Sequence, residues 1–375
     1  MADDVVIVGS GIAGLAAAYR LAPDHDVLLV DRSGIGEGTS SRASGVLTAP
    51  VDYPDQPAWS AHATQFFSDL DGTGTFSWVE REFIRGVRPA DSGAAEDTAR
   101  ADGVSLVDAD VYADVFDDDA PYERALIWED CGYCSVDDLL ATMHREVRNR
   151  GVECRPDTTV TSVLVEDGAT VGVETAYGTV EADAVVVAAG SQTRSLLADV
   201  LPLPIKKFTW NVAYLDVDVA EGYPMGGDQR LGAYWRRTRD GYLLVGVEHP
   251  YESEPSADAE ATFGDRLDTV FAEELPTVLA AVDREVNVVR YEVCPMADAT
   301  TPDATGIIDA PADGPDDLVV AAGFHGAGVM AAGSIGTAVR ARLTGEDAPF
   351  SLDPFALSRF DTRGPEFPFK TLFSS

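Results

Sequence analysis

"DDVVIVGSGIAGLAAAYRLAPDHDVLLVDRS", residues 3–33, carries the strongest structural signal in this chain. Val5 to Val8 predict a short buried strand, and Leu15 to Leu21 continue as an Ala-rich helix. A second strand is predicted from Val27 to Val30. Strand, glycine turn, helix and strand in this order are typical of the first unit of an α/β dinucleotide-binding fold.

The glycines between the first strand and the helix have the G-x-G-x-x-G spacing. We expect Gly9 to permit the tight turn, Gly11 to let the backbone approach a pyrophosphate, and Gly14 to let helix and strand pack closely. The phosphates would then lie at the positive end of the helix, against Ile12 and Ala13. The alternative is a tight turn that binds nothing.

The second strand ends in an acidic residue. Asp31, followed by Arg32, places a carboxylate where a ribose hydroxyl is expected. An acid rather than an arginine at this position disfavours a 2'-phosphate. NAD and FAD are therefore favoured over NADP.

The next segment, "GIGEGTSSRASGVLTAPVDYP" (34–54), favours FAD over NAD. A plain NAD dehydrogenase would continue with further βα units, whereas this segment is rich in small residues and shows no strand pattern. Ser40 and Ser41 can donate hydrogen bonds to phosphate or ribityl oxygens. Three small residues leave room for a flat ring, namely Ala43, Ser44 and Gly45. The alternative is an ordinary surface loop.

Later segments predict a return to the first sheet. An amphipathic helix precedes Gly151, a strand runs through Val160, and turns at 167–168 and 177–178 predict a hairpin. The strand Val185 to Ala188 then ends before Gly190. A last Val-rich strand and glycine run, "LVVAAGFHGAGVMAAGSIG" (318–336), resembles the start of another nucleotide-binding unit.

The pattern predicts two interleaved domains. Residues 1–82, 135–200 and 295–375 carry βα periodicity and glycines, as expected of a dinucleotide-binding domain. Residues 83–134 and 201–294 contain alternating runs such as "GYLLVGVEH", which predict a mainly antiparallel sheet with one solvated face. The expected fold class is α/β, with a Rossmann-type domain and a substrate-binding domain.

The chain resembles the D-amino-acid oxidase-like flavoprotein superfamily, which includes sarcosine oxidase, glycine oxidase, dimethylglycine dehydrogenase and D-amino-acid dehydrogenases. The matching segments include "VVIVGSGIAGLAAAYRLA", "TSSRASGVLTAP", "LPLPIKK", "TTPDATGIID" and "GFHGAGVMAAGSIG", in the order of the family. The resemblance implies a glutathione-reductase-type domain holding FAD, an amine or amino-acid substrate, and oxygen or an electron carrier as acceptor. It also implies cofactor contacts from Val160, Ala189 and Gly190.

The resemblance further implies that the late glycine run contacts the flavin ring of the same FAD. A helix expected from Val329 through Arg342 would direct its N-terminus at the ring, where it stabilises negative charge. We expect glycines there because a Cβ would hold the ring away. The expected loop contacts are Gly323, Phe324, His325, Gly326, Ala327, Gly328 and Val329. His325 could bind the flavin, face the substrate, or fill space between the domains.

The carboxylate anchor of the substrate is the open point of this resemblance. Sarcosine oxidases carry a lysine where this chain has Met330, and glycine oxidase carries an arginine where it has Gly326. Cations elsewhere are the remaining candidates, namely Arg42, Arg290, Arg236, Arg237, Lys206 and Lys207. Of these, Arg42, Arg290 and Lys207, with His325, are the predicted catalytic residues.

Covalent attachment of FAD is a second open point. Arg42 occupies the place where dimethylglycine dehydrogenases carry a flavin-linking histidine, and an arginine cannot form that linkage. Sarcosine oxidases attach FAD through a cysteine before the T-P-D segment, which makes Cys294 a candidate, although it stands two residues farther from Thr301 than expected. The alternative is a buried small residue at a strand end.

Composition restricts the partners. The net charge of −37, from 64 acidic and 27 basic residues, would repel nucleic acids and anionic lipids. A surface this acidic favours a halophilic source over a moderately acidic mesophilic protein. No long apolar run and no basic leader is present, so a soluble cytoplasmic protein without membrane insertion is expected. "CGYC" (131–134) has metal or redox spacing but no second pair, and no metal site is predicted.

The leading functional hypothesis is an FAD-dependent oxidoreductase that dehydrogenates the C–N bond of a small amino acid or N-alkyl amino acid. The imine formed by hydride transfer to flavin N5 would then hydrolyse. One alternative is FAD-dependent oxidation of a 2-hydroxy acid or polyol phosphate. The other is a flavin-binding protein without turnover.

Overall fold

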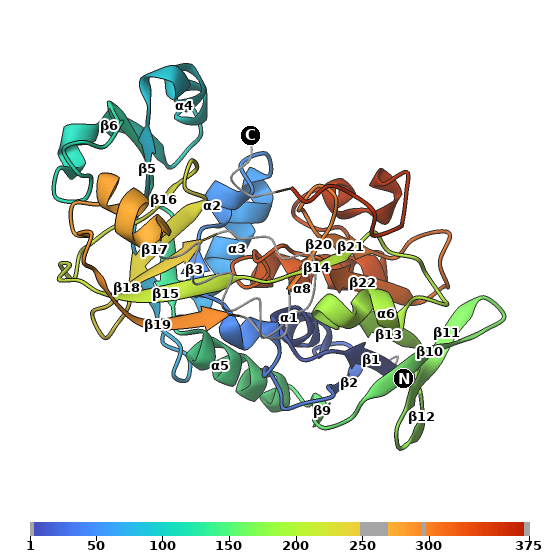
Figure 1. Ribbon diagram of the computed structural model, residues 1–375. Coiled ribbons are helices and arrows are strands. Elements are labelled where there is room, and N and C mark those ends of the chain that lie inside the picture. The colour runs from blue at the N-terminus through green and yellow to red at the C-terminus, as the bar shows by residue number, and fades with distance from the viewer. Residues whose placement is uncertain (1–3, 248–268, 294–297, 371–375) are drawn as a thin grey trace.

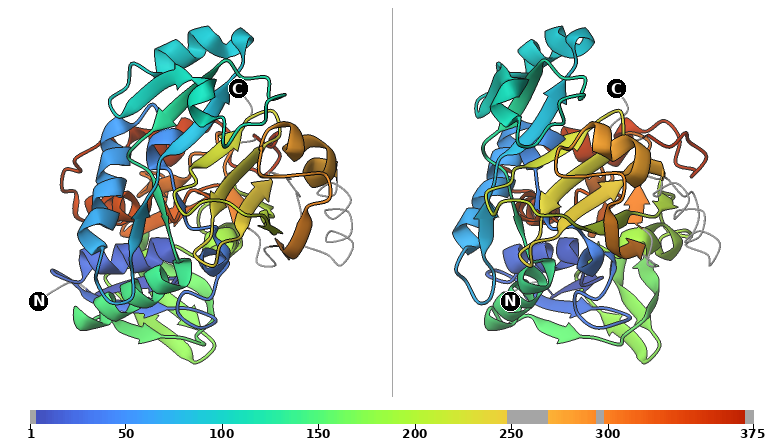
Figure 2. Two further views of the ribbon diagram at one scale, coloured as in Figure 1. Left: turned by 90° about the vertical axis from the view of Figure 1, so that its left-hand side faces the viewer. Right: turned by 60° about the vertical axis from the view of Figure 1, so that its left-hand side comes forward.

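Two large sheets form the framework of the protein in the computed structural model, which describes residues 4–247, 269–293 and 298–370. A six-stranded sheet has the order β21-β22-β13-β1-β2-β9, and an eight-stranded sheet has the order β19-β15-β18-β17-β16-β5-β7-β6. Figures 1 and 2 show the eight-stranded sheet beside the six-stranded one, with β6 and the β10–β12 hairpins at opposite extremes. The fold is α/β with mixed sheets.

The six-stranded sheet is parallel apart from its edge strand β21, which is antiparallel to β22. Its strands are β1 (Asp4–Val8), β2 (Asp26–Val30), β9 (Glu153–Arg155), β13 (Ala184–Val187), β21 (Ile307–Asp309) and β22 (Leu318–Ala322). Both faces are covered. Val5 and Ile7 pack with the helices, whereas Val6 and Val8 pack into a second cluster on the other face. This explains the unbroken apolar run in β1.

Four helices cover one face of this sheet: α1 (Ile12–Leu21), α3 (Pro57–Leu70), α5 (Val136–Asn149) and α8 (Ala332–Thr344). α1 and α8 approach so closely that a Cβ on Gly336 would collide with the Ala16 carbonyl. The contact brings the start and the end of the chain together. α5 begins at Ser135, whose hydroxyl accepts a hydrogen bond from the Asp138 amide, and its buried residues follow the predicted amphipathic pattern.

The predicted hairpin turns are confirmed. β10 (Val160–Glu166), β11 (Ala169–Thr175) and β12 (Gly178–Glu181) form a three-stranded antiparallel sheet. Asp167 and Gly168 have positive φ at the first turn, and Gly178 has positive φ at the second. These strands lead the chain back to β13 in the first sheet.

The eight-stranded sheet is antiparallel except between β16 and β5. Its strands are β5 (Phe83–Val87), β6 (Val104–Asp108), β7 (Arg124–Trp128), β15 (Asn211–Asp216), β16 (Met225–Asp228), β17 (Ala233–Arg237), β18 (Leu243–Val247) and β19 (Asn287–Val293). The predicted solvated face is wrong for the centre of the sheet, because all five residues of β18 are buried. One face packs on the core around Trp235 and Phe271, and the other includes Val212 and Tyr234 in a cavity wall.

The segment 34–54 does contain a strand, contrary to the sequence pattern. β3 (Val46–Leu47) pairs with β8 (Gly132–Cys134), which also pairs with β4 (Trp78–Glu80). A short helix, α2 (Ala49–Asp52), follows. A two-residue strand has no periodicity of its own, and the buried partner strand supplies its hydrogen bonds.

The helix of the late glycine run begins at Ala332 rather than at Val329 and ends at Thr344, before Gly345. His325 and Gly326 both have left-handed backbone conformations, with φ of 51° and 81°. Consecutive turns therefore occupy 325–331 before the helix starts. Smaller elements complete the described structure: α4 (Ser92–Thr98), α6 (Thr193–Leu196), β14 (Lys206–Phe208) and β20 (Asp298–Thr300).

No helix among the described residues combines the length and the apolar character that crossing a membrane requires.

Candidate active site

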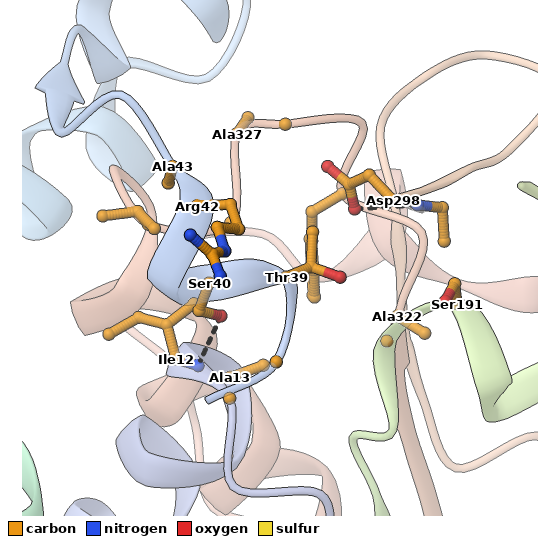
Figure 3. Close-up of a pocket in the computed structure, with 18 of the residues that line it drawn as sticks. Ile12, Ala13, Thr39, Ser40, Arg42, Ala43, Ser191, Asp298, Ala322 and Ala327 are labelled. Carbon is orange, nitrogen blue, oxygen red and sulfur yellow. Dashed lines mark hydrogen bonds between the residues drawn. The ribbon is translucent and has the colours of Figure 1, made fainter. Parts of the chain in front are cut away.

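A cavity of about 1020 Å³ is lined by residues of both large sheets. On one side its wall includes Val8, Val30 and Ala322, at the carboxyl ends of β1, β2 and β22. In open α/β sheets, ligands bind in the crevice outside these strand ends. Figure 3 shows the N-terminal loop with Ser40 and Arg42 on one side of the cavity and Ser191, Asp298 and Ala322 on the other.

The first glycine run places the N-terminus of α1 in the wall. Gly9 has φ of 101°, and a Cβ there would collide with the Ala188 carbonyl. Gly11, Ile12 and Ala13 all line the cavity. The N–H of Ile12 donates to Ser40 Oγ at 3.0 Å (Figure 3). The N-terminus of a helix offers backbone donors and a positive partial charge, which suits a pyrophosphate.

Gly14 does not line the cavity but serves packing. A Cβ on Gly14 would collide with the Gly9 carbonyl oxygen, so the first turn of α1 can lie on β1 only without a side chain here. The third glycine of the motif therefore supports the fold rather than touching the ligand.

Asp31 lies in the wall with its carboxylate fixed by four hydrogen bonds. Oδ2 accepts from the Ser10 amide at 2.7 Å and from Ser10 Oγ at 2.8 Å. Oδ1 accepts from the Ser33 amide and from Ser33 Oγ, both at 3.0 Å. A ribose hydroxyl that binds this carboxylate would replace the Ser33 hydroxyl, which can rotate away. The exposed Arg32 also lines the cavity.

The loop after β2 contributes alternate residues to the wall. Ser40, Arg42, Ala43 and Ser44 line the cavity, and Arg42 is exposed. Two predicted contacts of this loop are not in the wall, and both shape the loop instead. Ser41 Oγ donates to the Gly38 carbonyl at 2.9 Å. Gly45 has φ of 71° and lies where a Cβ would collide with the carbonyl of Cys134.

Val160, Ala189 and Gly190 line the cavity beside the loop that follows β13. All but one of the predicted contacts of the late glycine run do so too: Gly323, Phe324, Gly326, Ala327, Gly328 and Val329. The structure thus brings the two glycine runs to one cavity.

The late glycines are required for different reasons from the expected one. At Gly323 a Cβ would lie 2.8 Å from Thr301 Cγ2, and at Gly326 it would lie 2.6 Å from Trp210 Nε1. Both also have positive φ. The side chains of the protein itself therefore exclude a Cβ at these two positions. Only Gly328, whose nearest neighbour would be Phe324 Cβ at 3.6 Å, has the room expected for an approaching ligand.

His325 is fully buried and does not belong to the cavity wall. Its ring stacks on Phe208 with centroids 4.8 Å apart, and Nδ1 lies 2.7 Å from Thr300 Oγ1. Its N–H donates to the Ala299 carbonyl at 2.9 Å. Of the three expected roles, this placement matches space filling, so the expected direct contact with flavin or substrate is not found.

The other predicted cations also lie outside the wall. Arg290 is paired with Glu292 at 3.1 Å, and its guanidinium carbon lies 3.9 Å from the centroid of the Tyr214 ring. Lys207 belongs to β14, opposite Ala299. Arg236 donates from Nε to the Ser44 carbonyl at 2.7 Å and thereby supports the flavin-side loop. Cys294 lies outside the described residues.

Several wall residues were not predicted from the sequence: Thr48, Asp52, Phe83, Arg85, Trp210, Tyr234 and Asp298. Arg85 was missed because an arginine in an alternating strand usually faces solvent. The available signal was its spacing from Phe83, since two residues along a strand return to the same face. For Asp52, no sequence pattern distinguished it from the many surface acids.

Burial changes the titration of two carboxyl groups in this wall. Asp52 Oδ2 accepts a hydrogen bond from Thr48 Oγ1 at 2.7 Å, yet burial raises the pKa of Asp52 to about 6. Burial also raises the pKa of Asp298, whose Oδ1 accepts from the Ala299 amide at 2.7 Å. Both acids can exchange a proton within reach of a ligand in the cavity.

The cysteine pair forms no ligand site in the structure. Cys131 and Cys134 are buried free thiols, and burial raises the pKa of Cys134 to about 12. Within the described ranges, no group of three His, Cys, Asp or Glu side chains is placed to hold a metal ion.

The residues present fit an extended dinucleotide cofactor. One end offers an open helix N-terminus at Gly11 and a fixed carboxylate at Asp31. The same cavity reaches Gly328, where a Cβ is absent and the protein leaves space. Beyond it lies a part of the wall that includes Thr48, Asp52 and Trp210, which we call the inner chamber together with Val51, Phe83, Arg85, Tyr234, Gly326 and Met330.

Comparison with known proteins gives a family match over most of the chain. The model of a family described as FAD dependent oxidoreductase matches residues 4–342. The 4-methylaminobutanoate oxidase (formaldehyde-forming) of Paenarthrobacter nicotinovorans is 28% identical over 364 residues, which cover 88% of this chain and 42% of that protein. The glycine oxidase of Pseudomonas putida is 27% identical over 292 residues, covering 69% of this chain and 75% of that protein. The chain therefore spans less than half of the first relative.

Solved structures share the fold over nearly the whole chain. The glycine oxidase from Geobacillus kaustophilus has a TM-score of 0.79 at 19% identity, covering 96% of this chain and 100% of that one. The L-proline dehydrogenase from P. horikoshii has a TM-score of 0.76 at 18% identity, covering 96% and 98%.

Proposed function

We propose that this chain, which belongs to the FAD dependent oxidoreductase family, dehydrogenates the C–N bond of a small amino acid or N-alkyl amino acid. FAD is the cofactor of the family, and when bound it supplies the hydride acceptor. The substrate loses a hydride from carbon and a proton from nitrogen, which gives an imine. Water then converts the imine to a carbonyl compound and an amine.

The observation that carries the proposal is the continuity of one cavity. It extends from the N-terminus of α1 and Asp31 to the late glycine loop and the inner chamber. The α1 terminus and the Ser40 loop would hold the pyrophosphate, and Asp31 the ribose. The backbone around Gly328 would lie against the ring. A substrate in the inner chamber would then be adjacent to the reactive end of the cofactor.

The residues of the inner chamber suit a reaction that depends on positioning. Phe83 and Trp210 supply apolar walls that exclude water, while Thr48 and Asp52 supply polar atoms. Oxidation of an amine requires its neutral form, so a carboxylate with a raised pKa is a suitable proton acceptor. We assign that role to Asp52. The relatives named as a glycine oxidase and a 4-methylaminobutanoate oxidase support the choice of an amino-acid substrate.

An anaerobic reduction assay tests the proposal. The flavin band of the purified protein is followed on addition of D-amino acids, L-proline, sarcosine, dimethylglycine and 4-methylaminobutanoate. We expect bleaching by at least one of these amines, with release of ammonia, an alkylamine or formaldehyde. Bleaching only by 2-hydroxy acids or polyol phosphates would replace the proposal by alcohol oxidation. A flavin that no compound bleaches would indicate binding without turnover.

Admission of air after bleaching distinguishes an oxidase from a dehydrogenase. Rapid return of the flavin band with formation of hydrogen peroxide identifies oxygen as the acceptor. Slow return that an artificial electron carrier accelerates identifies a dehydrogenase.

A further inference from the structure

An arginine that the sequence analysis did not select lies in the inner chamber. Arg85 is the third residue of β5 and shares the cavity-lining face with Phe83. Its guanidinium carbon lies 5.1 Å from the centroid of the Trp128 ring, and Trp128 is itself buried on the neighbouring strand β7. This stacking fixes the plane of the guanidinium.

The guanidinium of Arg85 has no hydrogen-bond or ion-pair partner among the described residues, and its Nε is buried. The carboxylates that act on it electrostatically are Asp52 and Asp228. Each has another partner. Asp52 accepts from Thr48 Oγ1 at 2.7 Å, and Asp228 accepts from the Tyr122 hydroxyl and from the Leu231 amide. The donors of Arg85 therefore remain available to a ligand.

A charge in this position is unfavourable unless something pairs with it. Burial lowers the pKa of Arg85, but a guanidinium stays ionised in proteins, so the cation persists without a partner. A carboxylate is the ligand that best fits it, because two parallel N–H groups match its two oxygens. Such pairing would offset the cost of burying the cation.

The other cations of the wall lie elsewhere in it. Within the described residues, three arginines and no lysine line the cavity. Arg32 follows Asp31 at the end of β2, and Arg42 lies beside Ser40 and Ile12 near the N-terminus of α1 (Figure 3). Only Arg85 comes from the eight-stranded sheet.

The late glycine loop supplies no cation to the inner chamber. Met330 places its sulfur 3.8 Å from Thr48 Oγ1, and Gly326 lies under the Trp210 indole. These are the positions at which the resemblance to sarcosine and glycine oxidases led us to look for a carboxylate anchor. In this chain a cation enters the chamber from a different element of the fold.

We propose that Arg85 binds the carboxylate of the substrate and makes the enzyme select amino acids over simple amines. This inference rests on the proposed function and names the residue that would give it its substrate class. Arg85 and Asp52 then give the inner chamber one charge of each sign, as an amino-acid zwitterion requires. The anchor is supplied by β5, whereas the late glycine loop would contact only the cofactor.

The test compares matched substrates on the FAD-loaded protein. The most effective amino acid of the reduction assay is paired with its carboxamide, which keeps the amine and the size but lacks the negative charge. We expect the wild-type protein to prefer the carboxylate by about 100-fold in half-saturating concentration, since a charge-assisted pair in a shielded site is of this strength. Arg85→Gln should reduce that preference to less than about threefold, and Arg85→Lys should restore part of it.

The control variant is Arg88→Gln. Arg88 follows the same strand but is exposed and paired with Asp91 at 2.9 Å, so its loss should leave the preference unchanged. Flavin content and thermal unfolding show whether each variant is folded. Equal weakening of carboxylate and carboxamide in Arg85→Gln would assign Arg85 a structural role and overturn the inference.

The two proposals fail in distinguishable ways. If amines bleach the flavin but the wild-type protein does not prefer the carboxylate, the inference on Arg85 is wrong and the proposed function stands. If no amine bleaches it, acetate and acetamide serve as inert probes of the flavin spectrum. A spectral change caused by acetate alone that disappears in Arg85→Gln supports the anchor, and its persistence in that variant rejects it.

Discussion

The backbone N–H of Ile12 donates a hydrogen bond of 3.0 Å to Ser40 Oγ, across 28 residues of sequence. This bond joins the first turn of α1 to the loop that follows β2. It orients one donor of the helix terminus and leaves the neighbouring backbone of Gly11 and Ala13 in the cavity wall. Loop and helix therefore form one binding surface.

Replacing Ser40 should weaken FAD binding. In Ser40→Ala the Ile12 amide loses its acceptor and the loop loses its attachment, so we expect a loss of about 1–2 kcal/mol, or roughly 5- to 30-fold in the dissociation constant. Fluorescence quenching during reconstitution of the apoprotein measures it. Ser41→Ala is the matched control, because its hydroxyl bonds only to the Gly38 carbonyl outside the wall. Equal weakening in both variants would contradict the role given to Ser40.

Gly11 and Gly14 should differ in what they support. In Gly14→Ala the new Cβ collides with the Gly9 carbonyl, so the apoprotein should lose about 3 kcal/mol or more of stability and unfold at a lower temperature. In Gly11→Ala the nearest atom is Ser40 Oγ at 3.1 Å, so the apoprotein should unfold within about 1 kcal/mol of wild type but bind FAD poorly. Calorimetry of both apoproteins and their FAD content separate the two effects. Two variants with the same profile would show that the glycines share one role.

The sequence predicted the parts of the fold that depend on local periodicity. β1, α1, β2 and the hairpins formed where apolar spacing and turn residues indicated them. β3 and the start of α8 were not predicted, because the first depends on pairing with a distant strand and the second on left-handed turns at His325 and Gly326. Local spacing contains no information on either cause.

The cofactor end of the site was more predictable than the substrate end. A glycine run, a helix start and an acid in fixed order locate a pyrophosphate and a ribose from one continuous segment. The inner chamber instead combines Asp52, Arg85 and Trp210, which are remote in sequence and meet through the packing of two sheets. His325 was selected for its position in the glycine run, but its side chain points into the core.

His325 should prove to be a packing residue. Its buried ring contacts Phe208, Trp210 and Phe369, and its φ of 51° favours asparagine among small polar replacements. His325→Asn should therefore lower the free energy of unfolding by about 2–4 kcal/mol through the lost ring contacts. The rate of flavin reduction per bound FAD should stay within about threefold of wild type. A 100-fold slower reduction at unchanged stability would instead give this histidine a direct role.

Asp52 should make stability depend on pH in the direction opposite to that of a salt-bridged acid. Its pKa of about 6 in the folded protein exceeds the ordinary value of 3.8, so between these values the folded state binds more protons than the unfolded state. The free energy of unfolding contributed by this group therefore falls as pH rises from about 4 to 6, and the full cost is present above that range. Asp52→Asn removes the charge and should stabilise the protein at pH 7.5 by up to about 3 kcal/mol, with little change near pH 4.

Urea unfolding of Asp52→Asn and wild type across this pH range measures the effect, and Asp55→Asn, at an exposed position in the same loop, is the control. The same variant should reduce the flavin more slowly, because no carboxylate is left to accept the proton of the substrate amine. The deficit should diminish at high pH, where the free amine is abundant in solution. A variant that is less stable at pH 7.5, or a deficit that does not depend on pH, would show that Asp52 is neither a strained carboxylate nor the proton acceptor.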